Sequence, residues 1–133
     1  MKQGRVILAD THVNVLGAIR SLLETEAETV LMVADESSLW DALENFKPDV
    51  VVIDLPLLFA GGTNAAPTLK KKFPEIKMIV LSRYDENFVL NAVQAAGVEG
   101  LVLKSRAVID LIPALCEIRQ GRPFVSQGIR GEE

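Results

Sequence analysis

The chain has 133 residues, which is enough for one domain and too few for two. It carries 14 Lys and Arg residues against 18 Asp and Glu residues, and the resulting net charge of -4 argues against a basic, nucleic-acid-binding face. The single cysteine, Cys116, excludes an internal disulfide and fits a reducing compartment. No apolar run approaches the ~20 residues that span a bilayer, so we expect a cytoplasmic protein without a membrane partner.

Five short apolar runs predict the strands of a sheet. They cover residues 5–9, 29–34, 50–55, 77–82 and 100–103. Several of these runs are near-continuous rather than alternating. This pattern is typical of strands that are buried on both faces of a parallel sheet.

Segments with helical spacing separate these runs. The apolar positions that share a helical face are Val15, Ile19, Leu22 and Leu23; Leu39, Ala42, Leu43 and Phe46; Phe88, Val89, Ala92, Val93 and Ala96; and Leu111, Leu115 and Ile118. We expect Ser37 or Ser38 to cap the second of these helices at its N-terminus. Gly97 and Gly121 are expected to end the last two.

The third crossover is interrupted by Gly61-Gly62, and we expect its helix from about Ala65 to Lys72, where Pro67 is tolerated in the first turn. Pro113 is expected to kink or shorten the last helix. Five alternations of strand and helix predict a doubly wound, five-stranded parallel α/β domain over residues 1–126, with right-handed crossovers. Residues 127–133 are polar and read as a tail or the beginning of a linker.

Polar residues follow four of the predicted strands, at the edge where ligands of open parallel sheets bind. Asp10 and Thr11 follow the first strand, Asp54 the third, Ser82 the fourth and Lys104 the fifth. Asp54 is the candidate nucleophile toward a phosphoryl donor, and Asp10 the candidate ligand of Mg²⁺. Lys104 and Ser82 would contact the phosphoryl oxygens, because such transfers depend on offsetting charge.

The chain resembles the receiver domains of two-component response regulators along nearly its whole length. The matching stretches are VILADTH at 6–12, PDVVVIDL at 48–55, IVLSRYD at 79–85 and GLVLKS at 100–105, and EIRQGRPFVS at 117–126 resembles the NarL/LuxR subfamily. The resemblance implies a flavodoxin-like fold with strand order 2-1-3-4-5 and phosphorylation of Asp54 by a sensor histidine kinase or a small phosphodonor. It also implies Mg²⁺ held by Asp10, Asp54 and the backbone carbonyl of Pro56. It further implies a homodimer, and transcription regulation through a helix-turn-helix domain that is absent from this chain.

Three positions depart from the family pattern. Thr11 stands where the family has a second acid, and a neutral hydroxyl is a poorer Mg²⁺ ligand than a carboxylate. Leu57-Leu58 replaces a Met-Pro pair, with the proline displaced to Pro56, and Leu101 replaces an aromatic switch residue. These departures favour an alternative, a pseudo-receiver that binds proteins without phosphorylation. A flavodoxin-like enzyme or nucleotide binder is a further alternative, which the absence of a glycine-rich loop after the first strand argues against.

Two further expectations concern single residues. His12, the only histidine, is interpreted as an ordinary residue of this subfamily rather than as a catalytic group. Asp10 and Asp54 are expected to lie close together, so their like charges predict that Asp54→Asn leaves the fold equally or slightly more stable.

Overall fold

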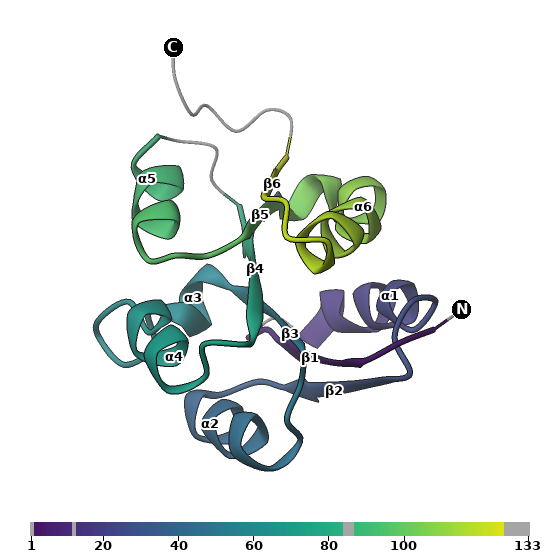
Figure 1. The fold of residues 1–133 in the computed structure, drawn as a ribbon, viewed down its shortest axis with the longest axis horizontal. Coiled ribbons are helices and arrows are strands. Elements are labelled where there is room, and N and C mark those ends of the chain that lie inside the picture. Colours follow the sequence, from purple (N-terminus) through teal and green to yellow (C-terminus); the bar gives the residue numbers. More distant parts are fainter. Residues whose placement is uncertain (1, 12, 84–86, 127–133) are drawn as a thin grey trace.

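The computed structural model describes residues 2–11, 13–83 and 87–126, of which 13–16 and 87–90 are described by their backbone. Over these residues the chain forms a six-stranded parallel sheet with helices on both faces (Figure 1). The strands are β1 (Arg5–Ala9), β2 (Thr29–Val33), β3 (Val50–Asp54), β4 (Lys77–Ser82), β5 (Gly100–Leu103) and β6 (Phe124–Val125). The helices are α1 (Val13–Leu23), α2 (Glu36–Asn45), α3 (Leu55–Leu58), α4 (Ala66–Lys72), α5 (Asn87–Ala95) and α6 (Ala107–Arg119), and η1 (Lys104–Arg106) is a single 3-10 turn.

The sheet has the order β2-β1-β3-β4-β5-β6, which confirms the predicted doubly wound fold and its order for the first five strands. The sixth strand was not predicted. It pairs in parallel with β5, with Phe124 opposite Gly100 and Val125 opposite Leu101. A strand of two residues is too short to produce a periodic pattern, so the sequence gives no signal for it.

The buried side chains of the strands alternate between two apolar clusters, one on each face of the sheet. One cluster joins alternate strand residues to α1 and α6, and the other joins the remaining strand residues to α2, α3, α4 and α5. These two groups of helices lie on opposite faces of the sheet (Figure 1). The central strand β3 is completely buried, which agrees with its continuous apolar sequence. Two covered faces hold the sheet rigid and fix the positions of residues at the ends of its strands.

The predicted helix limits need one correction. Asp35 rather than Ser37 or Ser38 caps α2, because its carboxylate accepts a hydrogen bond of 2.8 Å from the backbone N–H of Ser38. The glycine ends are confirmed, since Gly97 and Gly121 have φ values of 85° and 83°, a region that favours glycine.

The two prolines in helices have different outcomes. Pro67 lies in the first turn of α4, as predicted, and that helix covers Ala66–Lys72. Pro113 lies inside α6, which nevertheless continues as one helix to Arg119, so the expected shortening is wrong. Proline has no backbone N–H, so one carbonyl group of the preceding turn lacks its partner within the helix. Pro113 is exposed, and on this side of α6 that carbonyl group can accept a hydrogen bond from water.

Residues 127–133, predicted as a tail or linker, lie outside the described residues. Within the described parts of the chain, every helix falls short of the length and apolarity that crossing a membrane requires.

Candidate functional site

The register of the sheet brings the two predicted acids together. β1 and β3 are adjacent, with Ala9 opposite Ile53. Asp10 directly follows Ala9, and Asp54 directly follows Ile53. Neighbouring strands lie about 4.8 Å apart, so the two side chains leave the sheet edge close to one another. Both aspartates are completely buried. Burial of two acids at one edge is costly unless other groups compensate their charge.

The predicted serine and lysine reach the same edge from the next two strands. β4 follows β3 in the sheet, with Leu81 opposite Asp54, and Ser82 is the buried last residue of β4. Leu103, the last residue of β5, lies opposite Ser82, and Lys104 comes directly after it. The register therefore brings all four predicted residues together at the carboxyl ends of the strands.

The ammonium group of Lys104 compensates both buried acids. Its Nζ lies 3.1 Å from Asp10 Oδ2 and 3.5 Å from Asp54 Oδ2. The lysine side chain is 11% exposed, so these ion pairs are shielded from most of the solvent screening that weakens surface pairs. Lys104 thus acts as the cation that makes the burial of Asp10 and Asp54 tolerable.

Asp54 is also held by hydrogen bonds from two backbone amides and one hydroxyl. Its Oδ1 accepts from the N–H of Leu57 at 3.0 Å, which makes Asp54 the N-cap of the short helix α3. Its Oδ2 accepts from the N–H of Thr11 at 3.2 Å and from the Thr11 hydroxyl at 3.0 Å. Burial raises the pKa of Asp54, but hydrogen bonds from the N–H of Leu57 and from the N–H and hydroxyl of Thr11 lower it, and overall the pKa lies below its usual value. The carboxylate is therefore stabilised in its charged form.

Asp54 is therefore a helix cap as well as the candidate phosphoacceptor, and the sequence contains a signal for the cap. Asp is a preferred N-cap residue, and Pro56 lies in the first turn of the helix that follows, where proline is favoured. No helix was predicted here, because a helix of four residues is too short to show a periodic pattern. Leu57 and Leu58, which replace the family's Met-Pro pair, are both buried beneath the site.

The site offers Mg²⁺ one carboxylate fewer than the family pattern implies, because Thr11 stands in place of the second acid. Mg²⁺ favours several oxygen ligands in near-octahedral geometry, and carboxylates are its main protein ligands. Among the described residues no group of three or more His, Cys, Asp or Glu could hold a metal ion. Thr11 uses its hydroxyl as a hydrogen-bond donor to Asp54, so it does not replace the missing acid.

Leu101 and His12 are two other positions that the sequence singles out. Leu101, at the position of the family's aromatic switch residue, is 1% exposed and packs in the same apolar cluster as Val80 and Val93. A buried leucine has no second, exposed position comparable to that of a switching aromatic ring. His12 lies outside the described residues.

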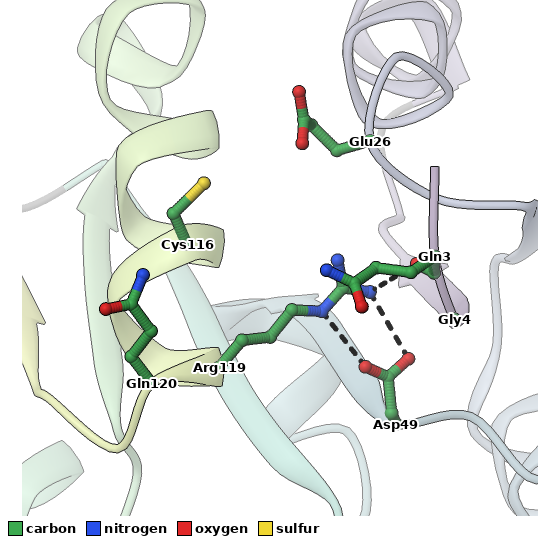
Figure 2. A pocket seen from close by; sticks show the side chains of 7 residues that line it. All are labelled: Gln3, Gly4, Glu26, Asp49, Cys116, Arg119 and Gln120. Carbon is green, nitrogen blue, oxygen red and sulfur yellow. Dashed lines mark hydrogen bonds and ion pairs between the residues drawn. The ribbon is translucent and has the colours of Figure 1, made fainter. Parts of the chain in front are cut away.

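A polar hollow of about 380 Å³ lies at the opposite edge of the sheet (Figure 2). Its lining includes Gln3, Asp49 and Cys116, and the guanidinium group of Arg119 crosses it. Arg119 donates a hydrogen bond of 3.0 Å to Asp49 Oδ2 and one of 2.9 Å to the carbonyl of Gln3. These hydrogen bonds connect the end of α6 to the residues directly before β1 and β3, so we interpret the contacts in the hollow as structural.

Comparison with known proteins agrees with this geometry. The family model of the response regulator receiver domain matches residues 6–115. The transcriptional regulatory protein RcsB of Escherichia coli K12 is 32% identical over 135 residues, which cover 97% of this chain and 62% of RcsB.

Two solved structures of RcsB superpose closely on this chain. The isolated receiver domain of RcsB from Salmonella enterica serovar Typhimurium, solved with the phosphomimetic BeF3⁻, has a TM-score of 0.83 at 28% identity and 96% coverage of both chains. A structure of two RcsB dimers bound to two parallel DNAs has a TM-score of 0.82 at 29% identity, covering 96% of this chain and 66% of that one.

Proposed function

The chain belongs to the family of response regulator receiver domains, and on that basis we propose that Asp54 accepts a phosphoryl group. The observation that carries the proposal is the contact of one ammonium group, Lys104 Nζ, with two buried acids at the edge of the sheet. The donor would be a sensor histidine kinase or a small phosphodonor such as acetyl phosphate. Related RcsB has been solved with a phosphomimetic, which supports a phosphoryl site in this fold.

In the proposed step an oxygen of Asp54 forms a bond to phosphorus as the bond from phosphorus to the donor's leaving group breaks. The low pKa of Asp54 favours the carboxylate that this attack requires. Lys104 would move from the two carboxylates toward the phosphoryl oxygens and offset their charge, and Ser82 would donate a hydrogen bond to them. Electrostatic stabilisation of this kind is the main contribution that a protein makes to phosphoryl transfer.

We propose that this chain binds Mg²⁺ weakly. Asp10, Asp54 and the backbone carbonyl of Pro56 would be its protein ligands, while Thr11 contributes at most a neutral oxygen. Receiver domains generally bind Mg²⁺ at this acidic pocket, so the substitution at position 11 affects the affinity rather than the location of the site.

The output of the switch is proposed to be a change on the surface formed by α5, β5 and α6. Charge added at Asp54 would draw the Ser82 hydroxyl toward it, and this would bias the surface that Ser82 adjoins. This chain spans about 62% of the length of RcsB, which is named a transcriptional regulatory protein. By analogy, transcription regulation would require a DNA-binding domain outside this chain, and dimers would form as in RcsB.

A second candidate function is a pseudo-receiver, which binds a partner without phosphorylation. The observation in its favour is that Thr11 donates two hydrogen bonds to Asp54 Oδ2, the oxygen that also faces Lys104. These donors stabilise the unmodified carboxylate and lower its reactivity as a nucleophile. They must be displaced or rearranged before Oδ2 can contact a metal ion.

Intact-protein mass spectrometry after incubation with acetyl phosphate and Mg²⁺ separates the two functions. A phosphoryl-switched receiver gains one phosphoryl group, and Asp54→Asn does not, because an amide oxygen cannot replace the carboxylate. A pseudo-receiver stays unmodified. Thr11→Asp is the matched gain-of-function variant: if it becomes phosphorylated while the parent does not, Thr11 is the residue that prevents the reaction.

A further inference from the structure

Lys104 is placed at the site by a short turn rather than by a regular element. It is the first residue of η1, which lacks a side-chain cap at its N-terminus. A lysine side chain has four rotatable bonds, so its ammonium group reaches two acids reliably only if the backbone beneath it is fixed. The groups that hold this turn therefore decide where the charge of Lys104 lies.

Both ends of the turn are joined to one network of hydrogen bonds. Leu103, directly before η1, donates its N–H to Ser126 Oγ at 3.1 Å. The Ser126 hydroxyl in turn donates to Asp110 Oδ2 at 2.7 Å. Asp110 also accepts 2.8 Å and 3.4 Å bonds from Arg106, the last residue of the turn. The network thus runs from Leu103 through Ser126 and Asp110 to Arg106 and encloses η1.

The network is buried and depends on the unpredicted strand. Ser126 is 1% exposed and Asp110 is 6% exposed, so neither has water as a ready alternative partner. Ser126 reaches this position because β6 pairs with β5 and its own N–H donates to the carbonyl of Leu101 at 2.9 Å. Buried polar groups that satisfy one another fix a single arrangement more strongly than apolar contacts do.

We propose that Ser126 and Asp110 are positioning residues that act through Lys104. They hold η1 so that the ammonium group faces Asp10 and Asp54, although neither residue reaches the two acids itself. The consequence for phosphoryl transfer rests on the proposed function, whereas the consequence for Lys104 does not. The position of Lys104 then depends on Ser126, which directly follows β6.

Competitive acylation of lysine amines, read by mass spectrometry, tests the effect on Lys104 directly. An amine paired with two acids reacts slowly, so we expect Ser126→Ala to raise the reactivity of Lys104 by roughly fivefold, the scale of one lost hydrogen bond of ordinary strength. Ser126→Thr keeps the hydroxyl and should react like the parent. Val125→Ala is the matched control in β6, because it shortens a neighbouring side chain outside the network.

The result that overturns the proposal is equal Lys104 reactivity in Ser126→Ala and the parent, with both shown by circular dichroism to be folded. An increase as large in Val125→Ala would also overturn it, because the effect would then report loosening of β6 alone. Lys70, whose amine belongs to another ion pair, provides an internal reference in every sample.

Phosphorylation by acetyl phosphate then tests the consequence. The Ser126→Ala variant should be labelled severalfold more slowly than the parent. The double variant with Lys104→Met should be labelled at the same rate as Lys104→Met alone, because both changes act on one group. Additive effects in the double variant would refute action through Lys104. If the parent is not labelled at all, the proposed function fails, while the acylation result still decides the role of Ser126.

Discussion

Replacing Asp54 by Asn tests whether the candidate phosphoacceptor also stabilises the fold. From the sequence alone, relief of repulsion between Asp10 and Asp54 favours an unchanged or slightly higher stability. The structure alters this expectation because Lys104 lies between the two acids and its ammonium group offsets their repulsion. In addition, Asp54 accepts hydrogen bonds from Leu57 and Thr11 within a fully buried setting.

An asparagine has one acceptor oxygen and one NH₂ group in place of two carboxylate oxygens. If its oxygen keeps the bond from Leu57, its NH₂ group faces the N–H of Thr11 and the ammonium group of Lys104, which are also donors. The Thr11 hydroxyl can rotate and accept, so one interaction is recovered. The loss of one bond to a charged acceptor and of one ion-pair contact should lower the free energy of unfolding by about 2 kcal/mol.

Thermal unfolding at pH 7 with a metal chelator is the appropriate assay. A loss of this size in a domain of this length lowers the melting temperature by about 5–10 °C. Asp35→Asn is the matched control, because Asp35 is an exposed helix cap where Asn serves equally well. If Asp54→Asn melts at or above the parent, repulsion between the acids dominates and the hydrogen bonds at Asp54 contribute little.

Three further predictions follow from the site and its surroundings. Calorimetric titration should show that Thr11→Asp binds Mg²⁺ about tenfold more tightly than the parent, a difference of about 1.4 kcal/mol in binding free energy. Equal affinities would contradict the role assigned to Thr11. Burial raises the pKa of Asp110, but hydrogen bonds from Arg106 and Ser126 lower it below its usual value overall. Its stabilising effect is thus present above its unfolded pKa of about 4 and is lost as the pH falls through the lower folded pKa. Urea unfolding between pH 6 and pH 3 should show a weaker pH dependence in Asp110→Asn than in the parent; parallel curves would exclude this contribution. Sedimentation over a concentration series should show weak dimerisation. Ile109→Glu should reduce this dimerisation, because Ile109 is an apolar residue of α6 that is 63% exposed. A parent protein that stays monomeric at every concentration would argue against dimerisation.

The sheet and most of the candidate site could be predicted because both depend on patterns of several residues. Strands buried on two faces produce continuous apolar runs, and parallel pairing places the residues after those runs at one edge. Asp10, Asp54, Ser82 and Lys104 were found in this way, since each is the last residue of a strand or follows one directly. That these four residues lie together can be predicted without knowing any individual contact.

The features that were missed depend on individual hydrogen bonds rather than on patterns of several residues. Ser126 is far from Asp110 in sequence, and only the pairing of β6 with β5 brings them together. The cap of α2 was assigned to the wrong residue because Asp35, Ser37 and Ser38 are all suitable caps, and local sequence does not rank them. Sequence patterns describe which face a residue occupies, whereas these choices are decided by hydrogen-bond geometry.

Thr11 links the stability of the site to its demand for a metal ion. The charges of two buried carboxylates and one ammonium group sum to -1, whereas an acid at position 11 would make this sum -2. The extra charge would attract Mg²⁺ more strongly, but it would also raise the energy of the metal-free fold. A hydroxyl at this position reduces both effects and donates a hydrogen bond to Asp54 as well. The same substitution therefore favours a stable metal-free state, and it would make the proposed phosphorylation of Asp54 more dependent on how Lys104 is positioned.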